Sequence, residues 1–279
     1  MNGVIMSNLH ERSSVRNGIV EIELNSWMEF VEFCDFYWSQ DFGLYFRGQR
    51  DSSWGLNTTL DRFSQTLDRR CGGTYKTLLG SFTKSLRGRS NVAKEIDRNV
   101  DEIWAIGQHN GLATPLLDWT TASYIALFFA FEEDTPSSTG KRTIWAVHKY
   151  IAEEMEVFNE NKTAEDEFKF VDLITDHNPR LLSQSGVFTK QPIAFNFESW
   201  IEERWKGITD RPVMFKVHLP DSERVRILTN LRQMNIHHAS IYPDVIGAAK
   251  YAQHELSLLD EKVKKMDNLS LIAHAHYSK

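Results

Sequence analysis

Cysteine is scarce in this chain of 279 residues, which contains only Cys34 and Cys71. Two cysteines without a CxxC spacing supply neither a disulfide framework nor a cysteine-ligated zinc site. Long apolar runs are also missing, because the most apolar stretch, residues 122–131, is too short for a membrane-spanning helix of about 20 residues. The first 17 residues are polar and lack the apolar core of a secretion signal. We therefore expect a cytoplasmic protein that does not associate with a membrane.

The chain has no excess of positive charge, since 32 Lys and Arg stand against 38 Asp and Glu, a formal net charge of −6. Nonspecific binding of nucleic acid depends on clustered cations, so a general polyanion binder is disfavoured. One stretch, residues 58–90, is nevertheless basic and carries Arg62, Arg69, Arg70, Lys76, Lys84, Arg87 and Arg89. Such a run is either a solvated helix face or a local site for a partner.

Well-known catalytic signatures are missing as well. The sequence has no HExxH, no GxSxG, no phosphate-binding loop and no dinucleotide-binding glycine fingerprint. The adjacent pair His237–His238 does not suit a metal, because neighbouring side chains on a regular element point in different directions. We expect no metal cofactor, and ATP use is disfavoured.

What is present is a globular composition, with 41% hydrophobic and 12% aromatic residues. Period-two patterns predict strands, and apolar residues spaced by three and four predict helices. No internal repeat or long linker divides the chain, so residues 1–279 are expected to form one α+β domain with a central mixed sheet and several flanking helices. The strands are predicted at 18–24, 44–49, 142–148 and 213–219. The helices are predicted after Ser26, over 58–90 with a break near 72–73, from Asn91, over 122–133, 150–176 and 197–205, from Asp221 to Met234, and from Pro243 to about Met266.

Three polar islands interrupt apolar stretches: Arg47-Gly48-Gln49, Gln108-His109 with Asp118-Trp119-Thr120, and Gln184-Ser185-Gly186. Polar groups in an apolar setting must be hydrogen-bonded or functional. A cleft built from all three would suit a phosphate-bearing ligand, with Arg47 on the phosphate and His109 or Asp118 in acid–base work. The alternative is an internal network in which Asp118 pairs with Arg47 and joins strand to helix.

These islands resemble motifs of the FRG domain family, named for its Phe-Arg-Gly motif. Residues 45–49 read YFRGQ, residues 108–120 read QHNGLATPLLDWT, and residues 126–130 read ALFFA. Residues 184–188, QSGVF, and residues 241–247, IYPDVIG, resemble two later elements of the family. The resemblance spans residues 43–252, with additions at the N-terminus and a C-terminal helix. Asn110 replaces a usual aromatic, and Pro115 stands where an arginine is common, which removes one cation from the site.

The FRG resemblance implies a bacterial protein of defence or toxin type. A weaker analogy, resting on residue order alone, links the chain to ADP-ribosyltransferase-like folds. In that scheme Arg47 holds a phosphate of NAD, Thr120 seats the nicotinamide ribose, and a later carboxylate polarises the ribose hydroxyl. The carboxylate is Glu132 or Asp244, and the analogy adds Phe46, Gly48, Gln49, Trp119 and Gln184 as cofactor-binding residues. The S-T-S signature of those folds is missing here.

Three hypotheses follow. The first is an enzyme that transfers or hydrolyses ADP-ribose from NAD and acts on a small molecule, a protein or a nucleic acid. The second is a module that binds a nucleotide or a nucleic-acid end through Arg47 and the basic helices, without turnover. The third is a metal-independent RNase that uses His109 and Asp118 as acid and base.

Overall fold

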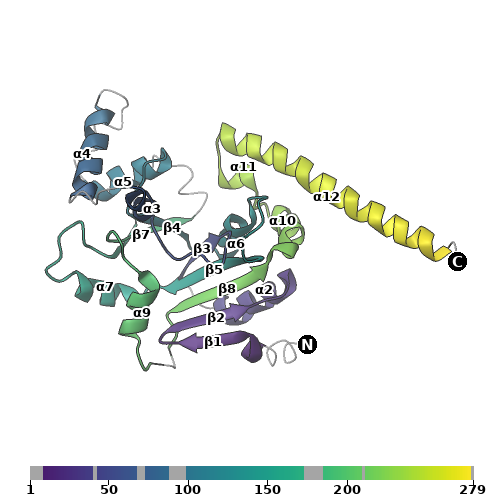
Figure 1. Cartoon of the computed structure of the whole chain (residues 1–279), viewed down its shortest axis with the longest axis horizontal. Helices are drawn as coiled ribbons and strands as arrows, with labels where there is room; N and C mark the ends of the chain where they lie inside the picture. Colours follow the sequence, from purple (N-terminus) through teal and green to yellow (C-terminus); the bar gives the residue numbers. More distant parts are fainter. Residues whose placement is uncertain are drawn as a thin grey trace.

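The structure, a computed structural model, describes residues 9–39, 43–67, 73–87, 99–172, 185–208 and 211–277. Its described strands form one eight-stranded sheet in the order β1-β2-β8-β5-β3-β4-β7-β6 (Figure 1). Strands β2 and β8 are parallel, and the other neighbouring strands in this order are antiparallel. The predicted α+β class with a mixed sheet is confirmed. The strands are β1 (Ser13–Arg16), β2 (Ile19–Glu23), β3 (Leu44–Gln49), β4 (Leu116–Thr120), β5 (Lys141–His148), β6 (Lys169–Val171), β7 (Gly186–Lys190) and β8 (Met214–Pro220).

Helices cover both faces of this sheet and its β4–β7 end (Figure 1). The longest, α12, extends away from the rest of the molecule toward the C-terminus. The described helices are η1 (His10–Arg12), α2 (Trp27–Phe33), the π-helix η2 (Cys34–Trp38), α3 (Thr59–Gln65), α4 (Thr74–Leu86), α5 (Val100–His109), α6 (Ser123–Phe131), α7 (Ile151–Asn159), α9 (Phe197–Arg204), η4 (Asp221–Glu223), α10 (Arg224–Gln233), α11 (His238–Ile241) and α12 (Val245–Tyr277).

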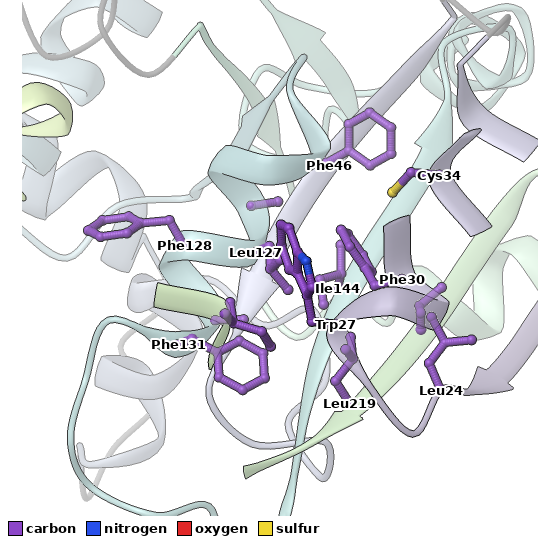
Figure 2. Close-up of a cluster of buried hydrophobic side chains, with 14 of the residues drawn as sticks. Leu24, Trp27, Phe30, Cys34, Phe46, Leu127, Phe128, Phe131, Ile144 and Leu219 are labelled. Atoms are coloured by element: carbon purple, nitrogen blue, oxygen red, sulfur yellow. The ribbon is translucent and has the colours of Figure 1, made fainter. Parts of the chain in front are cut away.

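One face of the sheet carries the largest apolar cluster, in which α2, α6 and α10 pack on the central strands (Figure 2). Helix α6 is apolar on nearly every side, and Leu127, Phe128 and Phe131 are at most 1% exposed. The apolar run noted at residues 122–131 is therefore a helix buried at the centre of the molecule. Cys34 lies in the same cluster, where burial raises the pKa of its thiol to about 12.

Helix α6 approaches β3 so closely that only glycine fits at position 48. A Cβ on Gly48 would lie 1.9 Å from the carbonyl oxygen of Ala126 and 2.6 Å from the backbone nitrogen of Ala130. Real Cβ atoms do not come this near to backbone atoms. The glycine of the Phe-Arg-Gly motif is therefore required by the packing of a helix backbone on a strand.

The opposite face is rich in aromatic side chains beneath α7 and α9. Phe168 packs against Phe197 and Trp200 in edge-on geometry, with ring centroids 4.7 and 5.0 Å apart. A third cluster joins α3, α4 and α5 to β4 and β7, and in it the indole nitrogen of Trp104 donates to the hydroxyl of Tyr75 at 2.8 Å. Helix α3 places Arg62 of the basic stretch in a pocket with Arg47 of β3 and Asp118 of β4.

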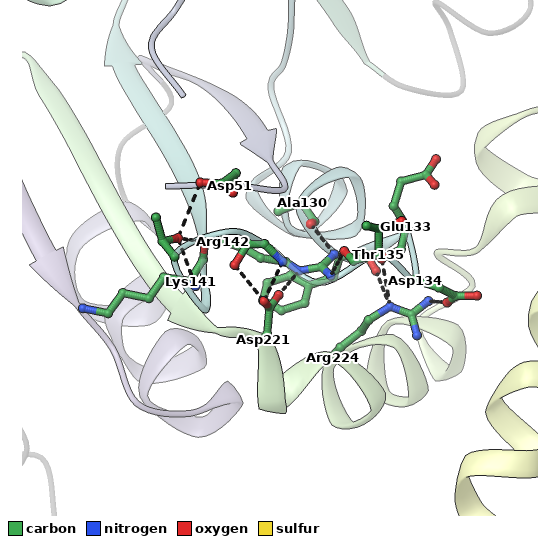
Figure 3. Close-up of polar contacts among 12 residues, drawn as sticks. Asp51, Ala130, Glu133, Asp134, Thr135, Lys141, Arg142, Asp221 and Arg224 are labelled. Atoms are coloured by element: carbon green, nitrogen blue, oxygen red, sulfur yellow. Dashed lines mark hydrogen bonds and ion pairs between the residues drawn. The ribbon is translucent and has the colours of Figure 1, made fainter. Parts of the chain in front are cut away.

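Two buried arginines hold the C-terminal end of α6 (Figure 3). Arg142, 1% exposed, donates to the carbonyls of Ala130, Glu133 and Thr135 and pairs with Asp221. Arg224 donates to the carbonyls of residues 131–133 and pairs with Asp134. The last carbonyls of a helix lack partners within it and carry partial negative charge, so two guanidinium groups are a stable way to satisfy them.

Several predicted elements need correction. Residues 150–176 were expected to be mostly helical, yet α7 ends at Asn159 and residues 169–171 form β6 at the edge of the sheet, where main-chain pairing with β7 decides the conformation. Asp221 was expected to cap a helix, but its carboxylate instead binds Arg142 and Ser137. The final helix runs to Tyr277 rather than to about Met266. The cap expected at Asn91 lies outside the described residues, and α5 begins after Asn99.

The other expected strands and helices are confirmed within a few residues of their predicted ends. Ser26 caps α2 by accepting from the nitrogen of Glu29, and the Glu29 carboxylate accepts from the nitrogen of Asn25. In the part of the chain that the structure describes, no helix combines the length and apolarity needed to cross a membrane.

Candidate functional site

The candidate site begins where β3 and β4 part. Phe46 pairs with Thr120 across the two strands, and this is the single residue pair that joins them in the described sheet. Beyond it the guanidinium of Arg47 lies against β4, where Nη1 donates to the carbonyl of Asp118 at 2.7 Å. The Arg47 side chain thus occupies the Asp118 carbonyl, which would otherwise be free to bond the backbone of β3, and the two strands do not pair further.

A cleft of about 380 Å³ opens at this point. It contains five of the six predicted catalytic residues: Arg47, His109, Asp118, Thr120 and Glu132. Their elements are β3, α5, β4 and the end of α6, so the fold joins segments separated by as many as 85 residues, counting from 47 to 132. The remaining lining residues are Phe46, Gly48, Ala105, Gln108, Trp119, Phe129, Gly186, Val187, Phe188 and Tyr242.

Arg47 is the cation of the cleft. Its side chain is 19% exposed, and its Nε is buried without a hydrogen-bond partner among the described residues. Burial lowers the pKa of Arg47, the carboxylate of Asp118 opposes that effect, and Arg62 lowers the pKa further. The Asp118 carboxylate is 3.8 Å from Nη1 and is itself 61% exposed, so it compensates the charge only in part. Arg47 therefore contacts Asp118 and faces the cleft at the same time.

Asp118 is positioned by the second motif. The side-chain nitrogen of Gln108 donates to Asp118 Oδ1 at 2.6 Å, and the other end of the Gln108 amide accepts from the hydroxyl of Thr114. The chain Thr114–Gln108–Asp118–Arg47 ties α5 and the loop before β4 to the cation on β3. The same residues therefore form both an internal hydrogen-bond network and the wall of a cleft.

Glu132 is the buried carboxylate of the cleft, 12% exposed at its side chain. The hydroxyl of Tyr242 lies 3.0 and 3.1 Å from its two oxygens, and Nε2 of His238 lies 3.3 Å from Oε2. Its backbone carbonyl accepts from Arg224 at 3.1 Å. Hydrogen bonds on both oxygens and an anchored main chain leave this carboxylate little freedom to rotate.

Thr120 and Trp119 shape the wall of the cleft. Thr120 is 2% exposed, and its hydroxyl accepts from the nitrogen of Ala122 at 3.1 Å. The N-cap residue of α6 is Ala122, and Thr120 stabilises the turn before it. The indole of Trp119 packs in the aromatic cluster on the other face and donates to Thr189 at 2.9 Å.

Three predicted site residues do not line the cleft or lie outside the described chain. Gln49 is 7% exposed, donates to the carbonyl of Gly55 and accepts from the indole of Trp145, so it serves the core and borders a neighbouring hollow. Asp244 accepts from the nitrogen of Gly247 at 2.8 Å and so caps the start of α12. Gln184 lies outside the described residues, although Gly186, Val187 and Phe188 of the same motif line the cleft.

Sequence reasoning did not name Tyr242 or His238 as site residues. Tyr242 belongs to the last motif, whose Gly247 is also forced by packing, since a Cβ there would lie 1.9 Å from the carbonyl oxygen of Tyr242. That tight turn orients the tyrosine, and the motif was the signal for it. His238 is 4% exposed, and the sequence offers nothing that pairs it with Glu132. Within the described ranges, no group of three or more His, Cys, Asp or Glu side chains is arranged to hold a metal ion.

Comparison with known proteins places the first two motifs in a family. No curated protein matches the chain, and no solved structure matches it. One family model matches, the FRG domain, over residues 43–139. The matched segment supplies β3, α5, β4 and α6, which carry Arg47, His109, Asp118 and Glu132 into the cleft. The later motifs at 184–188 and 241–247 lie beyond the match, so the similarity to the FRG domain family covers residues 43–139.

Proposed function

We propose that the cleft binds NAD and cleaves its glycosidic bond between nicotinamide and ribose. The observation that carries the proposal is that Arg47, Thr120 and Glu132 line one cleft, in which Tyr242 donates a hydrogen bond to the carboxylate and His238 contacts it. Of the two carboxylates that the sequence left open, Glu132 fits the role, because Asp244 caps α12 outside the lining.

Each residue has a role that follows from its chemistry. Arg47 binds a phosphate oxygen, for which its buried Nε and charged fork are suited. Glu132 accepts a hydrogen bond from a ribose hydroxyl and stabilises the positive charge that develops on the ribose as the bond breaks. The bonding electron pair leaves with the nicotinamide nitrogen, which becomes neutral. Water or an acceptor hydroxyl then adds to the ribose carbon and releases a proton to solvent.

The test is release of nicotinamide from NAD by the purified chain, read by chromatography, together with labelling of lysate components by labelled NAD. Glu132→Gln keeps the shape of the side chain and removes its charge, so it should lower the rate by about 10²–10³-fold. Tyr242→Phe should lower it less, because His238 still holds the carboxylate. Glu156→Gln, on the exposed side of α7, is the matched control and should leave the rate unchanged. Wild-type protein that neither consumes NAD, labels any component nor shifts its melting temperature with NAD would end the proposal.

NAD consumption would also fit the defence or toxin role that the family resemblance implies, because loss of NAD stops growth. Expression of the wild-type chain should then arrest a bacterial host, while expression of Glu132→Gln should not. Equal growth of the two cultures, with equal protein levels, would contradict this role.

RNA cleavage is the second candidate, favoured by the presence of His109 and Asp118 in the same cleft. An imidazole and a partly exposed carboxylate are suited to acid–base catalysis of phosphodiester cleavage. The assay is cleavage of end-labelled RNA in the presence of a metal chelator. Cleavage that persists unchanged in His109→Ala would exclude this assignment.

A further inference from the structure

A second hollow, of about 750 Å³, adjoins the cleft. The two share Arg47, Gly48 and Phe129, so they meet at the cation on β3. The hollow is bordered by the turn after β3 and by α3. Its other lining residues are Gln49, Arg50, Trp54, Gly55, Asn57, Arg62, Gln65 and Glu133.

Three arginines, Arg47, Arg50 and Arg62, border this hollow. Arg62 is exposed on α3, and its Nη1 donates to the carbonyl of Asn57 at 2.7 Å. Arg62 and Arg47 lie close enough that the first lowers the pKa of the second, beyond the effect of burial. Glu133 is the one acidic side chain among the lining residues, and it faces Lys250 at 3.9 Å. Like charges gathered in this way favour a bound anion that carries more than one negative charge.

An aromatic ring lies at the border of the same hollow. Trp54 is 45% exposed, and the guanidinium carbon of Arg50 is 5.2 Å from the centroid of its ring. An indole held by an arginine on a turn is suited to stack a nucleobase, a contact typical of proteins that bind nucleotides. Trp54 makes no contribution to the three apolar clusters of the core.

We propose that the hollow is the subsite for the second nucleotide of a pyrophosphate-linked dinucleotide. In this arrangement the diphosphate lies on Arg47 and Arg62, the base stacks on Trp54, and the reacting ribose reaches Glu132 in the cleft. Arg47 lines both the cleft and the hollow. A ligand that fills both spaces must therefore place its negatively charged diphosphate at Arg47, with one nucleoside on each side of it. The inference rests on the proposed function for the reacting half, and it assigns the second nucleotide of the substrate to the hollow.

The test measures calorimetric binding of ADP, which is the half assigned to the hollow, and of nicotinamide mononucleotide, which is the half assigned to the cleft. Trp54→Ala and Arg62→Ala should each weaken ADP binding about tenfold or more, and they should leave nicotinamide mononucleotide binding within twofold of wild type. Trp54→Phe should restore most of the affinity for ADP. Arg87→Ala, an exposed arginine at the end of α4, is the control for loss of charge alone. Trp54 is exposed, so its substitution should leave the melting temperature near that of wild type, and Trp54→Phe carries the test if the alanine variant does not fold.

The outcomes separate this inference from the proposed function. Binding of ADP that depends on Trp54 and Arg62, in a protein that does not cleave NAD, supports the subsite and removes the proposed reaction. Cleavage of NAD with KM unchanged in both variants keeps the reaction and overturns the subsite. Binding of a short single-stranded oligonucleotide at Trp54, with no binding of ADP, overturns it in favour of a nucleic-acid groove.

Discussion

The contact between Gly48 and α6 gives a prediction that can be worked out in detail. In Gly48→Ala the new Cβ would lie 1.9 Å from the Ala126 carbonyl oxygen, about 1.5 Å inside the 3.4 Å at which ordinary contact begins. Both crowded atoms belong to the backbone of a buried helix, so no change of rotamer relieves the overlap. Overpacking costs about 1–3 kcal/mol, and we expect the upper end of that range because α6 must shift as a whole.

The assays are urea unfolding of the purified protein, monitored by circular dichroism, and a separate measurement of its melting temperature. A loss of about 3 kcal/mol in a chain of this size lowers the melting temperature by about 6–12 °C. Gly80→Ala is the matched control, because Gly80 lies inside α4 and a Cβ there meets nothing within 4 Å. That substitution should raise the free energy of unfolding by about 0.5–1 kcal/mol, the preference of a helix interior for alanine. Unfolding of Gly48→Ala within about 0.5 kcal/mol of wild type would refute the reasoning.

Three further predictions concern buried charges. Arg142→Met removes the side-chain donor of the Ala130 and Thr135 carbonyls and the cationic partner of Asp221, so it should lower the free energy of unfolding by about 3–5 kcal/mol in urea. Arg204→Met, at an exposed pair, should lower it by at most about 1 kcal/mol. Burial raises the pKa of Asp51, but hydrogen bonds from Ser53 and Ser138 outweigh this effect and hold the pKa below its usual value. The contribution of Asp51 to the stability of the folded protein is therefore complete above about pH 4 and is lost as the pH falls further. Asp51→Asn should therefore flatten the decline in stability below about pH 4 in acid titrations of the melting temperature. Burial, His238 and Arg224 lower the pKa of His254 to about 4. As the pH falls from about 6.5 to about 4, the unfolded chain therefore binds a proton at this histidine that the folded protein does not, and the folded protein loses stability. This loss, measured as the melting temperature against pH, should be smaller in His254→Gln.

Much of the fold could be predicted because its signals are local. Alternation along residues 18–24 and the apolar spacing after Ser26 reflect burial of one face, which neighbouring residues suffice to specify. The apolar run of α6 implies its central position for the same reason. Residues 150–176 misled prediction because an acidic, helix-favouring composition does not reveal that residues 169–171 pair with β7 at the sheet edge.

The candidate site divides in the same way. Polar residues that interrupt apolar runs identified Arg47, His109, Asp118 and Thr120, the analogy to ADP-ribosyltransferase-like folds added Glu132, and all five line one cleft. Gln49 has an equally polar side chain in an equally apolar run, yet its amide bonds Gly55 and Trp145 within the core. Arg47 lines the cleft whereas Gln49 bonds to the core, because the sheet brings different partners to each of them.

By itself, the sequence determined the α+β class, the strands and helices with strong periodicity, the FRG motifs and the place of the site along the chain. Only the tertiary structure decided that β3 and β4 part after one residue pair, that Arg47 fills the gap, and that Glu132 rather than Asp244 lines the cleft. Tyr242 and Glu132 are 110 residues apart, and their hydrogen bond exists because α6 and the turn before α12 pack together. Periodicity records the burial of each residue against its near neighbours, whereas the meeting of distant polar groups depends on register and on the packing of whole elements, which no local pattern encodes.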